Sequence, residues 1–238
     1  LARKIFADHG LNPVPLPMDA EGLLVEAVAE ALGRTRPAFL YTIPTYHNPT
    51  SVCLSAARRE QLARLSRDRG LMVVADEVYH PLAYTETPPP PLSTFIPSAP
   101  GILSIGSFSK ILAPGLRLGW LQAAPAVIAR FVGCGLLDSG GGLNPFTSGI
   151  VRSALEIGRV GETLAFLKRT YAARLRALCS ALREQLPAGV QFAEPAGGFF
   201  VWLTLPEGAD TTALRAAALA ENVDFMPGER FSNRGGLK

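Results

Sequence analysis

Short polar clusters that follow apolar runs carry the residue types most suited to chemistry. They are HNPT at 47–50, DEVY at 76–79, SFSK at 107–110 and Arg117, which follow or open the apolar runs 38–43, 71–75, 101–106 and 116–121. Short, continuously apolar runs separated by helical signals are typical of buried parallel strands. Ligands of such sheets bind beyond the carboxyl ends of the strands, so we expect the four clusters to converge in space.

Lys110 is the best candidate for a nucleophile. Of the four lysines, Lys4 and Lys238 lie at the termini and Lys168 lies in a charged helical segment, whereas Lys110 follows a buried strand. A surface lysine is the ordinary interpretation, but the apolar run and the scarcity of lysine favour a functional one. A lysine amine shielded from water can form a Schiff base with an aldehyde.

The other polar residues of the clusters allow two interpretations each. Asp76 follows an apolar run, so it is either a turn or cap residue or a buried carboxylate that needs a cation, such as a protonated pyridine nitrogen. Asn48 is either a turn residue or a ligand-binding amide. Two serines and an arginine could be a cap and a surface charge, or could bind a phosphate through hydroxyls and a guanidinium. These three are Ser107, Ser109 and Arg117.

The elements that must position these residues indicate an α/β fold. Ser55 is a candidate N-cap for a helix that ends at Gly70. The second half differs, because leucines recur every three or four residues over 164–186 as in a long amphipathic helix. Strands over 190–192 and 199–203 and a helix after Asp210 follow. We predict a mostly parallel sheet with helices on both faces over 1–160, and a smaller α+β domain over 161–238.

Composition excludes several classes of protein. The 238 residues are 48% hydrophobic and 18% charged with a formal net charge of +3, which excludes a disordered chain and argues against a nucleic-acid binder. No apolar run approaches the ~20 residues of a membrane span. Three widely spaced cysteines indicate a reducing, cytoplasmic compartment. His9 and His80 lack partners at metal-ligand spacing, and the glycines at 140–142 are expected to form a flexible connection rather than a nucleotide-binding loop.

Four motifs together resemble those of a known family. NPT at 48–50, DEVY at 76–79, SFSK at 107–110 and PGLRLGW at 114–120 are similar, in order and spacing, to motifs of the class I/II aminotransferases. Those are pyridoxal-phosphate enzymes of fold type I, the aspartate-aminotransferase-like fold. PTYHNPT and LLDSGGGLNPF resemble the branch of 2-aminoadipate and multi-substrate aminotransferases and the related effector domains of transcription regulators.

The resemblance implies roles for single residues. Lys110 would be the Schiff-base lysine and the general acid/base of the proton shift, and Asp76 would pair with the protonated ring nitrogen. Tyr79 and Asn48 would bind the phenolic oxygen of the ring, and Val78 would pack on one ring face. The implied catalytic residues are Lys110, Asp76 and Tyr79. The implied cofactor-binding residues are Asn48, Asp76, Val78, Tyr79, Ser107, Ser109, Lys110 and Arg117.

Some features of the family pattern differ. The position after Asn-Pro-Thr carries Ser51 where the family has glycine, so the local turn geometry is expected to shift. The chain begins at Leu1 rather than Met, and we expect it to be truncated at both ends. An upstream phosphate loop with a ring-stacking aromatic and a downstream arginine that clamps the substrate carboxylate would then be missing. We do not assign that clamp to Arg230 or Arg234, and we expect the isolated chain to be largely inactive.

The implied activity is transfer of an amino group from an amino acid to a 2-oxo acid, in a cytoplasmic homodimer. Neither the donor nor the acceptor can be derived from the sequence. A carbon–sulfur lyase would use the same lysine and aspartate, and product analysis would distinguish it. An effector domain of a transcription regulator would need an additional winged helix. No nucleic-acid or membrane partner is expected for this chain itself, and no metal.

Overall fold

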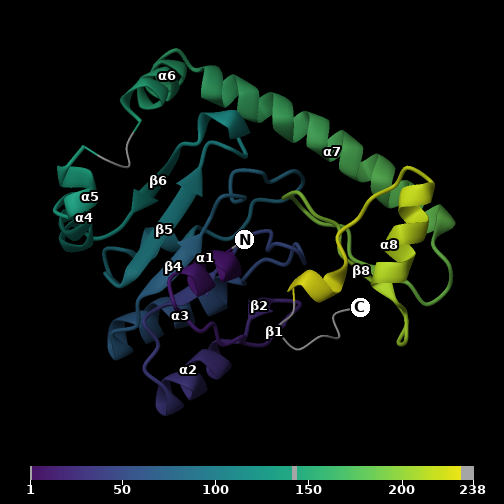
Figure 1. Ribbon diagram of the computed structural model, residues 1–238, viewed down its shortest axis with the longest axis horizontal. Helices are drawn as coiled ribbons and strands as arrows, with labels where there is room; N and C mark the ends of the chain where they lie inside the picture. The colour runs from purple at the N-terminus through teal and green to yellow at the C-terminus, as the bar shows by residue number, and fades with distance from the viewer. Residues whose placement is uncertain (1, 141–143, 232–238) are drawn as a thin grey trace.

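The computed structural model describes residues 2–140 and 144–231 and shows a four-stranded sheet surrounded by helices (Figure 1). Strands β3 (Leu40–Thr42), β4 (Val73–Asp76), β5 (Ile102–Ser107) and β6 (Gly119–Gln122) lie in this order. The first three are parallel and β6 is antiparallel to β5. The prediction of a mostly parallel α/β sheet is therefore confirmed.

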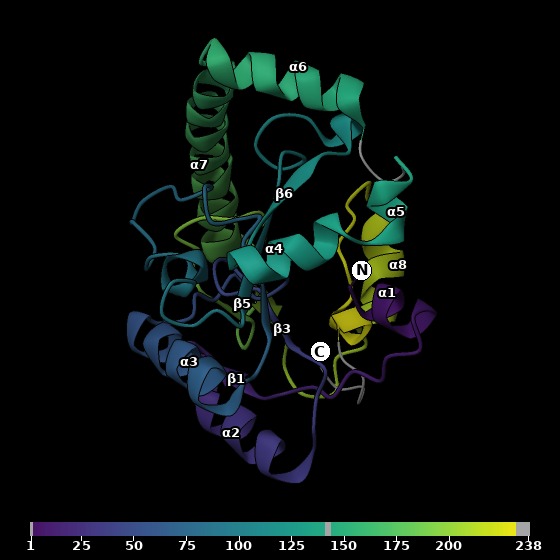
Figure 2. The ribbon, with the colours of Figure 1, turned by 90° about the vertical axis from the view of Figure 1, so that its left-hand side faces the viewer.

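One face of the sheet packs against helices and forms the main core. Leu40, Val73 and Ile102 are neighbours in the strand register, and they pack against α2 (Val25–Arg34) and α3 (Ala56–Arg69). Figure 2 shows both helices on this side of the sheet. The short apolar strands are thus buried by helices, as a parallel sheet requires.

The second face carries the alternate residues of the same strands. Helix α1 (Ala2–Asp8) lies on it, because the Phe6 ring packs edge-on against Phe39 at 5.5 Å and Tyr41 at 5.4 Å between ring centroids. Helices therefore cover both faces, as predicted. Tyr41 and Asp76 lie on this second face, so the sheet alternation separates the candidate site from the main core.

Helix α3 begins and ends where its sequence signals place it. The Ser55 side chain accepts a hydrogen bond from the Arg58 backbone N–H, and Gly70 ends the helix in the left-handed conformation at φ +64°. Glycine adopts this conformation without steric cost. The strand expected over 116–121 begins later, at Gly119, because Pro114–Leu116 form the 3₁₀ helix η2 and Arg117 takes φ +51°.

The second half is mainly helical. It contains α4 (Pro125–Val132), α5 (Gly135–Asp138), α6 (Pro145–Glu156) and the 27-residue α7 (Arg159–Gln185). Helix α7 runs from the α6 end of the sheet to the C-terminal elements (Figure 1). It is the long amphipathic helix that the leucine spacing predicts. Gly140 has φ +78°, and the rest of the expected glycine connection lies outside the described residues.

The C-terminal elements are β7 (Gln191–Phe192), β8 (Leu203–Thr204) and α8 (Thr211–Ala220), whose N-cap Asp210 accepts bonds from two backbone N–H groups. β7 and β8 form an antiparallel pair. The prediction of a strand over 199–203 is wrong for most of its length. The turn before this segment is hydrogen-bonded to the segment 82–84 instead: the Gly198 N–H donates to the Leu82 carbonyl, and the Tyr84 N–H donates to the Ala196 carbonyl. The domain boundary near residue 160 stays a prediction.

Four short elements complete the described chain. β1 (Met18–Asp19) and β2 (Gly22–Leu23) form a second antiparallel pair, and η1 (Leu92–Phe95) and η3 (Gly228–Phe231) are 3₁₀ helices. Across residues 2–140 and 144–231, no helix combines the length and the apolar character that crossing a membrane requires.

Candidate active site

Asp76 lies at the carboxyl end of β4, directly after the buried Ala75. Its Oδ2 atom accepts a hydrogen bond of 2.5 Å from the Tyr41 hydroxyl of the neighbouring strand β3. Burial raises the pKa of the Asp76 carboxyl, while the Tyr41 bond, the Val78 backbone N–H and the nearby charge of Lys110 act in the opposite direction. The site thus holds a desolvated carboxyl close to a lysine, as the motif order predicts.

Lys110 lies just beyond β5 and is partly buried. Its Nζ atom lies 5.7 Å from the centre of the Phe199 ring, a cation–π distance. Phe199 also packs edge-on against Tyr79, with ring centroids 5.6 Å apart. An aromatic residue from the second half of the chain therefore lies beside Lys110 at the sheet edge.

Asn48 and Tyr79 face each other at this edge. Burial raises the pKa of the Tyr79 hydroxyl, and a hydrogen bond with the Asn48 side chain opposes the rise. The Asn48 Oδ1 atom is buried, and within the part of the chain that the structure describes it has no hydrogen-bond partner. A buried acceptor without a donor is costly, so this atom marks a place for an external donor.

Ser51 closes the loop that carries Asn48. Its φ of +60° lies in the left-handed region that favours glycine, which explains why glycine suits this position. The Ser51 hydroxyl donates a 2.6 Å hydrogen bond to the Phe200 carbonyl, 149 residues further along the chain. Ser51 thus takes a conformation that glycine adopts readily, and its hydroxyl tethers the loop to the aromatic segment.

The three residues expected to bind a phosphate lie together. The Ser109 backbone N–H donates to Ser107 Oγ at 3.1 Å, and Arg117 Nη1 donates to Ser109 Oγ at 3.4 Å and to the Pro114 carbonyl at 3.2 Å. Arg117 is exposed. A guanidinium, two hydroxyls and a turn of backbone N–H groups are suited to an anion at the end of β5.

Val78 and His47 make contacts that are typical of packed side chains. Val78 packs against the small cluster formed by Tyr46, Tyr79, Leu82 and Ile111. His47 Nδ1 lies 3.0 Å from Thr50 Oγ1, and burial lowers the pKa of His47 to about 4, so the imidazole is neutral. These contacts are those of a packed side chain. Within the described ranges, no group of three histidine, cysteine or acidic side chains is placed to hold a metal ion.

Sequence reasoning missed three contributors to this site. Tyr41 binds Asp76, Phe199 covers Lys110, and Phe200 packs against Tyr79 with ring centroids 5.7 Å apart. Strand alternation could have found Tyr41, which shares a sheet face with Asp76. No local signal identifies the two phenylalanines, because their partners lie more than 80 residues away.

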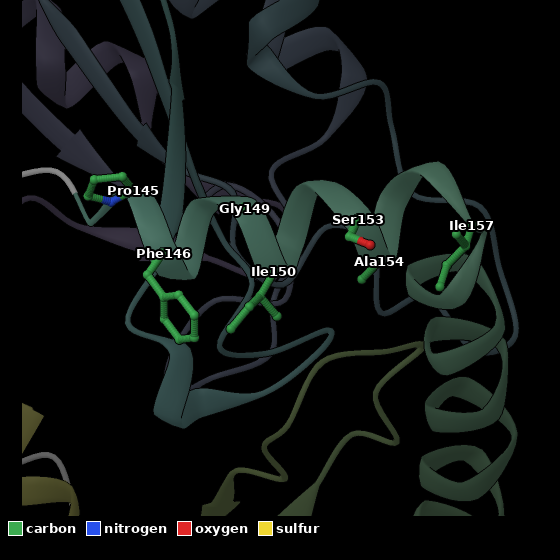
Figure 3. Close-up of a pocket in the computed structure, with 7 residues that line it drawn as sticks. All are labelled: Pro145, Phe146, Gly149, Ile150, Ser153, Ala154 and Ile157. Carbon is green, nitrogen blue, oxygen red and sulfur yellow. The ribbon is translucent and has the colours of Figure 1, made fainter.

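An apolar hollow lies on another part of the surface. Residues from Pro145 to Ile157 of α6 line it, and Figure 3 shows Phe146 and Ile150 projecting from the same side of the helix. The Phe146 side chain is 78% exposed. The lining residues come from α6 and its C-cap Ile157, carry no charged side chain and include none of the candidate site residues.

Comparison with known proteins identifies the family. The family model described as "Aminotransferase class I and II" matches residues 3–236. The chain is 35% identical to the 2-aminoadipate transaminase of Thermus thermophilus over 239 aligned residues, which cover 99% of this chain and 59% of that relative. It is 31% identical to the HTH-type transcriptional regulator YdfD of Bacillus subtilis, covering 98% of this chain and 48% of that relative.

A solved structure shows the same arrangement of elements. The α-aminoadipate aminotransferase LysN of Thermus thermophilus, in complex with N-(5'-phosphopyridoxyl)-L-leucine, matches with a TM-score of 0.87 and 35% identity. The match covers 96% of this chain and 59% of that one. The chain thus spans less than two thirds of the length of these relatives.

Proposed function

Because the chain belongs to the class I and II aminotransferase family, we propose that its protein transfers an amino group between an amino acid and a 2-oxo acid with pyridoxal phosphate. The fold is the aspartate-aminotransferase-like fold of type I, in part, since the match to the solved relative covers 59% of that relative. The observation that carries the proposal is the convergence of Lys110, Asp76 and Tyr79 at one edge of the sheet.

The residues present fit this cofactor. The buried Asp76 carboxyl lies at the sheet edge, where a cationic ring nitrogen would stabilise its charged form. Ser107, Ser109 and Arg117 would hold the phosphate. When bound, pyridoxal phosphate supplies an aldehyde for amines and a ring that accepts electrons.

Each residue of the site has a definite task in the proposed reaction. Asp76, held by the Tyr41 hydroxyl, would keep a proton on the ring nitrogen through its negative charge. Lys110 would bind the aldehyde carbon through Nζ, and its amine, once free, would take the proton from the α-carbon of the substrate and deliver it to the carbon of the former aldehyde. Tyr79 and Asn48 would bind the phenolic oxygen, and the Phe199 ring would lie beside Nζ.

The test is covalent capture at Lys110. Borohydride reduction of the full-length protein with bound pyridoxal phosphate should fix a pyridoxyl group, and peptide mapping should place it on Lys110. Lys168→Arg is the matched control and should leave the label in place. A label on Lys168, or no label on any lysine, would overturn the proposal.

A second candidate function has support from relatives that are named as transcriptional regulators. The regulator YdfD matches nearly the whole chain, so the same fold also fits the effector part of a longer DNA-binding protein. A DNA mobility-shift assay on the full-length protein separates the two functions, because a pure enzyme should not retard DNA. A carbon–sulfur lyase would release ammonia and pyruvate from a sulfur amino acid, whereas a transaminase yields a new amino acid.

We further propose a cytoplasmic homodimer in amino-acid metabolism. Exposed apolar residues on α6 support a contact with a second copy, since large apolar patches are uncommon on isolated chains. Three free cysteines are in keeping with a reducing compartment. We also propose that the isolated 238 residues bind pyridoxal phosphate more weakly than the full-length protein does.

A further inference from the structure

A buried arginine lies beneath the candidate site. The Arg59 side chain is 1% exposed, and its guanidinium donates to main-chain carbonyls at both ends of the loop that carries the motif NPT. Nε binds the Leu54 carbonyl at 2.9 Å, Nη2 binds the Pro44 carbonyl at 2.7 Å, and Nη1 binds the Pro90 carbonyl at 3.2 Å. One planar group thus holds three separate stretches of backbone together.

Glu77 neutralises this arginine from the neighbouring strand end. Its Oε1 atom lies 3.9 Å from Arg59 Nη1, and Glu77 is 6% exposed. Oε1 also accepts from the Leu92 backbone N–H at 2.7 Å, and Oε2 accepts from the Ser104 hydroxyl at 2.6 Å and from the Ser93 N–H at 3.3 Å. Both buried charges therefore have partners, which such charges require.

A further contact of Arg59 extends the network to His80, the residue after Tyr79. Arg59 Nη2 donates to Thr45 Oγ1 at 2.9 Å, so the single Thr45 hydroxyl proton is free for His80 Nδ1, 3.2 Å away. Burial and the charge of Arg59 lower the pKa of His80 to about 4, in keeping with a neutral ring that accepts this proton. Thr45 is itself fully buried.

The members of this network adjoin the site residues in the chain. Thr45 lies three residues before Asn48, Glu77 directly follows Asp76, and His80 directly follows Tyr79. Ser104 lies on β5, the strand that leads to Lys110. We propose that Arg59 is a positioning residue: through Thr45, Glu77 and the two loop carbonyls it fixes the three segments whose side chains would bind the cofactor ring.

This inference rests on the proposed function. The role that it gives to Arg59 is to position other residues, not to take part in the reaction. Arg59 touches neither Lys110 nor Asp76 in the described contacts, so it would act through the placement of Asn48 and Tyr79. A lysine at this position keeps the charge beside Glu77 but cannot bind the Leu54, Pro44 and Pro90 carbonyls together, because an ammonium lacks the planar fork. Arg59→Lys therefore separates geometry from charge.

The experiment compares Arg59→Lys with Arg58→Lys in the full-length protein. Arg58 is a matched control, because its fork binds the exposed Asp19 on another side of the same helix. In Arg59→Lys, we expect pyridoxal phosphate affinity to fall about tenfold or more, since small displacements of binding groups are costly. The pH midpoint of the bound cofactor's visible absorbance should also shift, whereas Arg58→Lys should keep the wild-type affinity and midpoint.

A second readout needs no cofactor. In the cofactor-free protein, hydrogen exchange of the His47 and Leu54 amides, which bond within the loop, should accelerate about tenfold in Arg59→Lys, because local opening becomes easier. If the wild-type protein fails to bind pyridoxal phosphate, the proposed function fails, while the exchange result still decides whether Arg59 orders the loop.

A folded Arg59→Lys with a lower melting temperature, but with wild-type affinity, midpoint and exchange, would show a merely structural residue and overturn the inference. If Arg59→Lys does not fold, Thr45→Val takes its place. It removes only the hydroxyl between Arg59 and His80, and it should shift the midpoint from its wild-type value and accelerate the exchange of the His47 and Leu54 amides. A folded Thr45→Val with an unchanged midpoint and unchanged exchange would then overturn the inference.

Discussion

At the scale of single residues, Asp76 combines a functional role with a cost in stability. Its carboxyl is held by the Tyr41 hydroxyl, yet burial raises its pKa above the ordinary value. Such a group contributes stability that is present at low pH and lost as the pH rises through the folded-state pKa, because the buried form must then ionise. Above this pKa, the cofactor-free protein therefore carries a destabilising charge at the site where the cofactor is proposed to bind.

The prediction for Asp76→Asn follows from this balance. The cofactor-free variant should be more stable than the wild type above the raised pKa of Asp76, and the difference should shrink as the pH falls and the wild-type carboxyl protonates. Its kcat in the full-length protein should fall roughly 100- to 1,000-fold, the scale of a lost electrostatic contribution. Urea unfolding across the pH range and steady-state kinetics measure the two effects.

The matched control for Asp76→Asn is Asp68→Asn, which alters an exposed carboxylate paired with Arg67. It should change neither the stability of the cofactor-free protein nor kcat appreciably, because exposed ion pairs contribute little to stability. A stability gain in Asp76→Asn that does not depend on pH would contradict the burial argument. Near-normal turnover would reduce Asp76 to a turn residue.

Ser51 offers a second test at this scale, because its strained backbone and its tether to Phe200 can be separated. Ser51→Ala keeps the left-handed conformation at φ +60° but loses the hydroxyl bond, so it should cost about 1 kcal/mol. Ser51→Gly also loses the bond but relieves a conformation worth roughly 1–2 kcal/mol. The glycine variant should therefore unfold at higher urea than the alanine variant, and the reverse order would show that Ser51 is unstrained.

At the scale of elements, the contact between β5 and β6 depends on a glycine. Gly106 pairs with Trp120 across the two strands, and a Cβ atom on Gly106 would overlap the indole ring. The indole is held in place by Phe108, whose ring centroid lies 4.9 Å away. Because β5 leads directly to Ser107 and Lys110, displacement of this pair would reach the candidate site.

We predict that Gly106→Ala destabilises the protein by about 1–3 kcal/mol, as overpacking does in a filled core. Adding Trp120→Leu should recover part of the loss by making room. Gly115→Ala is the control, because nothing lies within 4 Å of its added Cβ, and it should stay within about 0.5 kcal/mol of the wild type. Denaturant unfolding measures all three, and equal effects of the two single variants would contradict the packing argument.

At the scale of the whole molecule, the apolar hollow on α6 carries the prediction about assembly. Phe146 is 78% and Ile157 66% exposed, and the hollow they help to line is uncharged. A charge placed there would have to be desolvated in a dimer contact. Phe146→Asp should therefore weaken self-association of the full-length protein at least about tenfold, equivalent to about 1.4 kcal/mol.

Sedimentation velocity over a concentration series measures this association. Val14→Asp is the control, since Val14 is equally apolar and 68% exposed but lies before β1, away from α6. It should sediment as the wild type does. An unchanged dimer in Phe146→Asp would place the contact on another surface, and a wild-type monomer at all concentrations would reject the dimer itself.

The sequence by itself determined the features that depend on local physical chemistry. The caps at Ser55, Gly70 and Asp210 each satisfy backbone groups within a few residues, and the apolar runs report burial of strands. The positions of Asn48, Asp76, Ser107 and Lys110 at strand ends followed from those runs. Because carboxyl ends of parallel strands share one sheet edge, local signals were enough to bring these residues together.

Only the tertiary structure decided how the second half of the chain meets this edge. The run 199–203 has the composition of a strand. Its backbone and the turn before it are instead hydrogen-bonded to Ser51, Leu82 and Tyr84, and this places Phe199 beside Lys110. Likewise, the sequence around Arg59 indicates an exposed arginine on a surface helix, yet its side chain is buried. The reason is physical: sequence periodicity reports which face of an element is apolar, whereas the partner of that face depends on contacts formed between residues far apart in the chain.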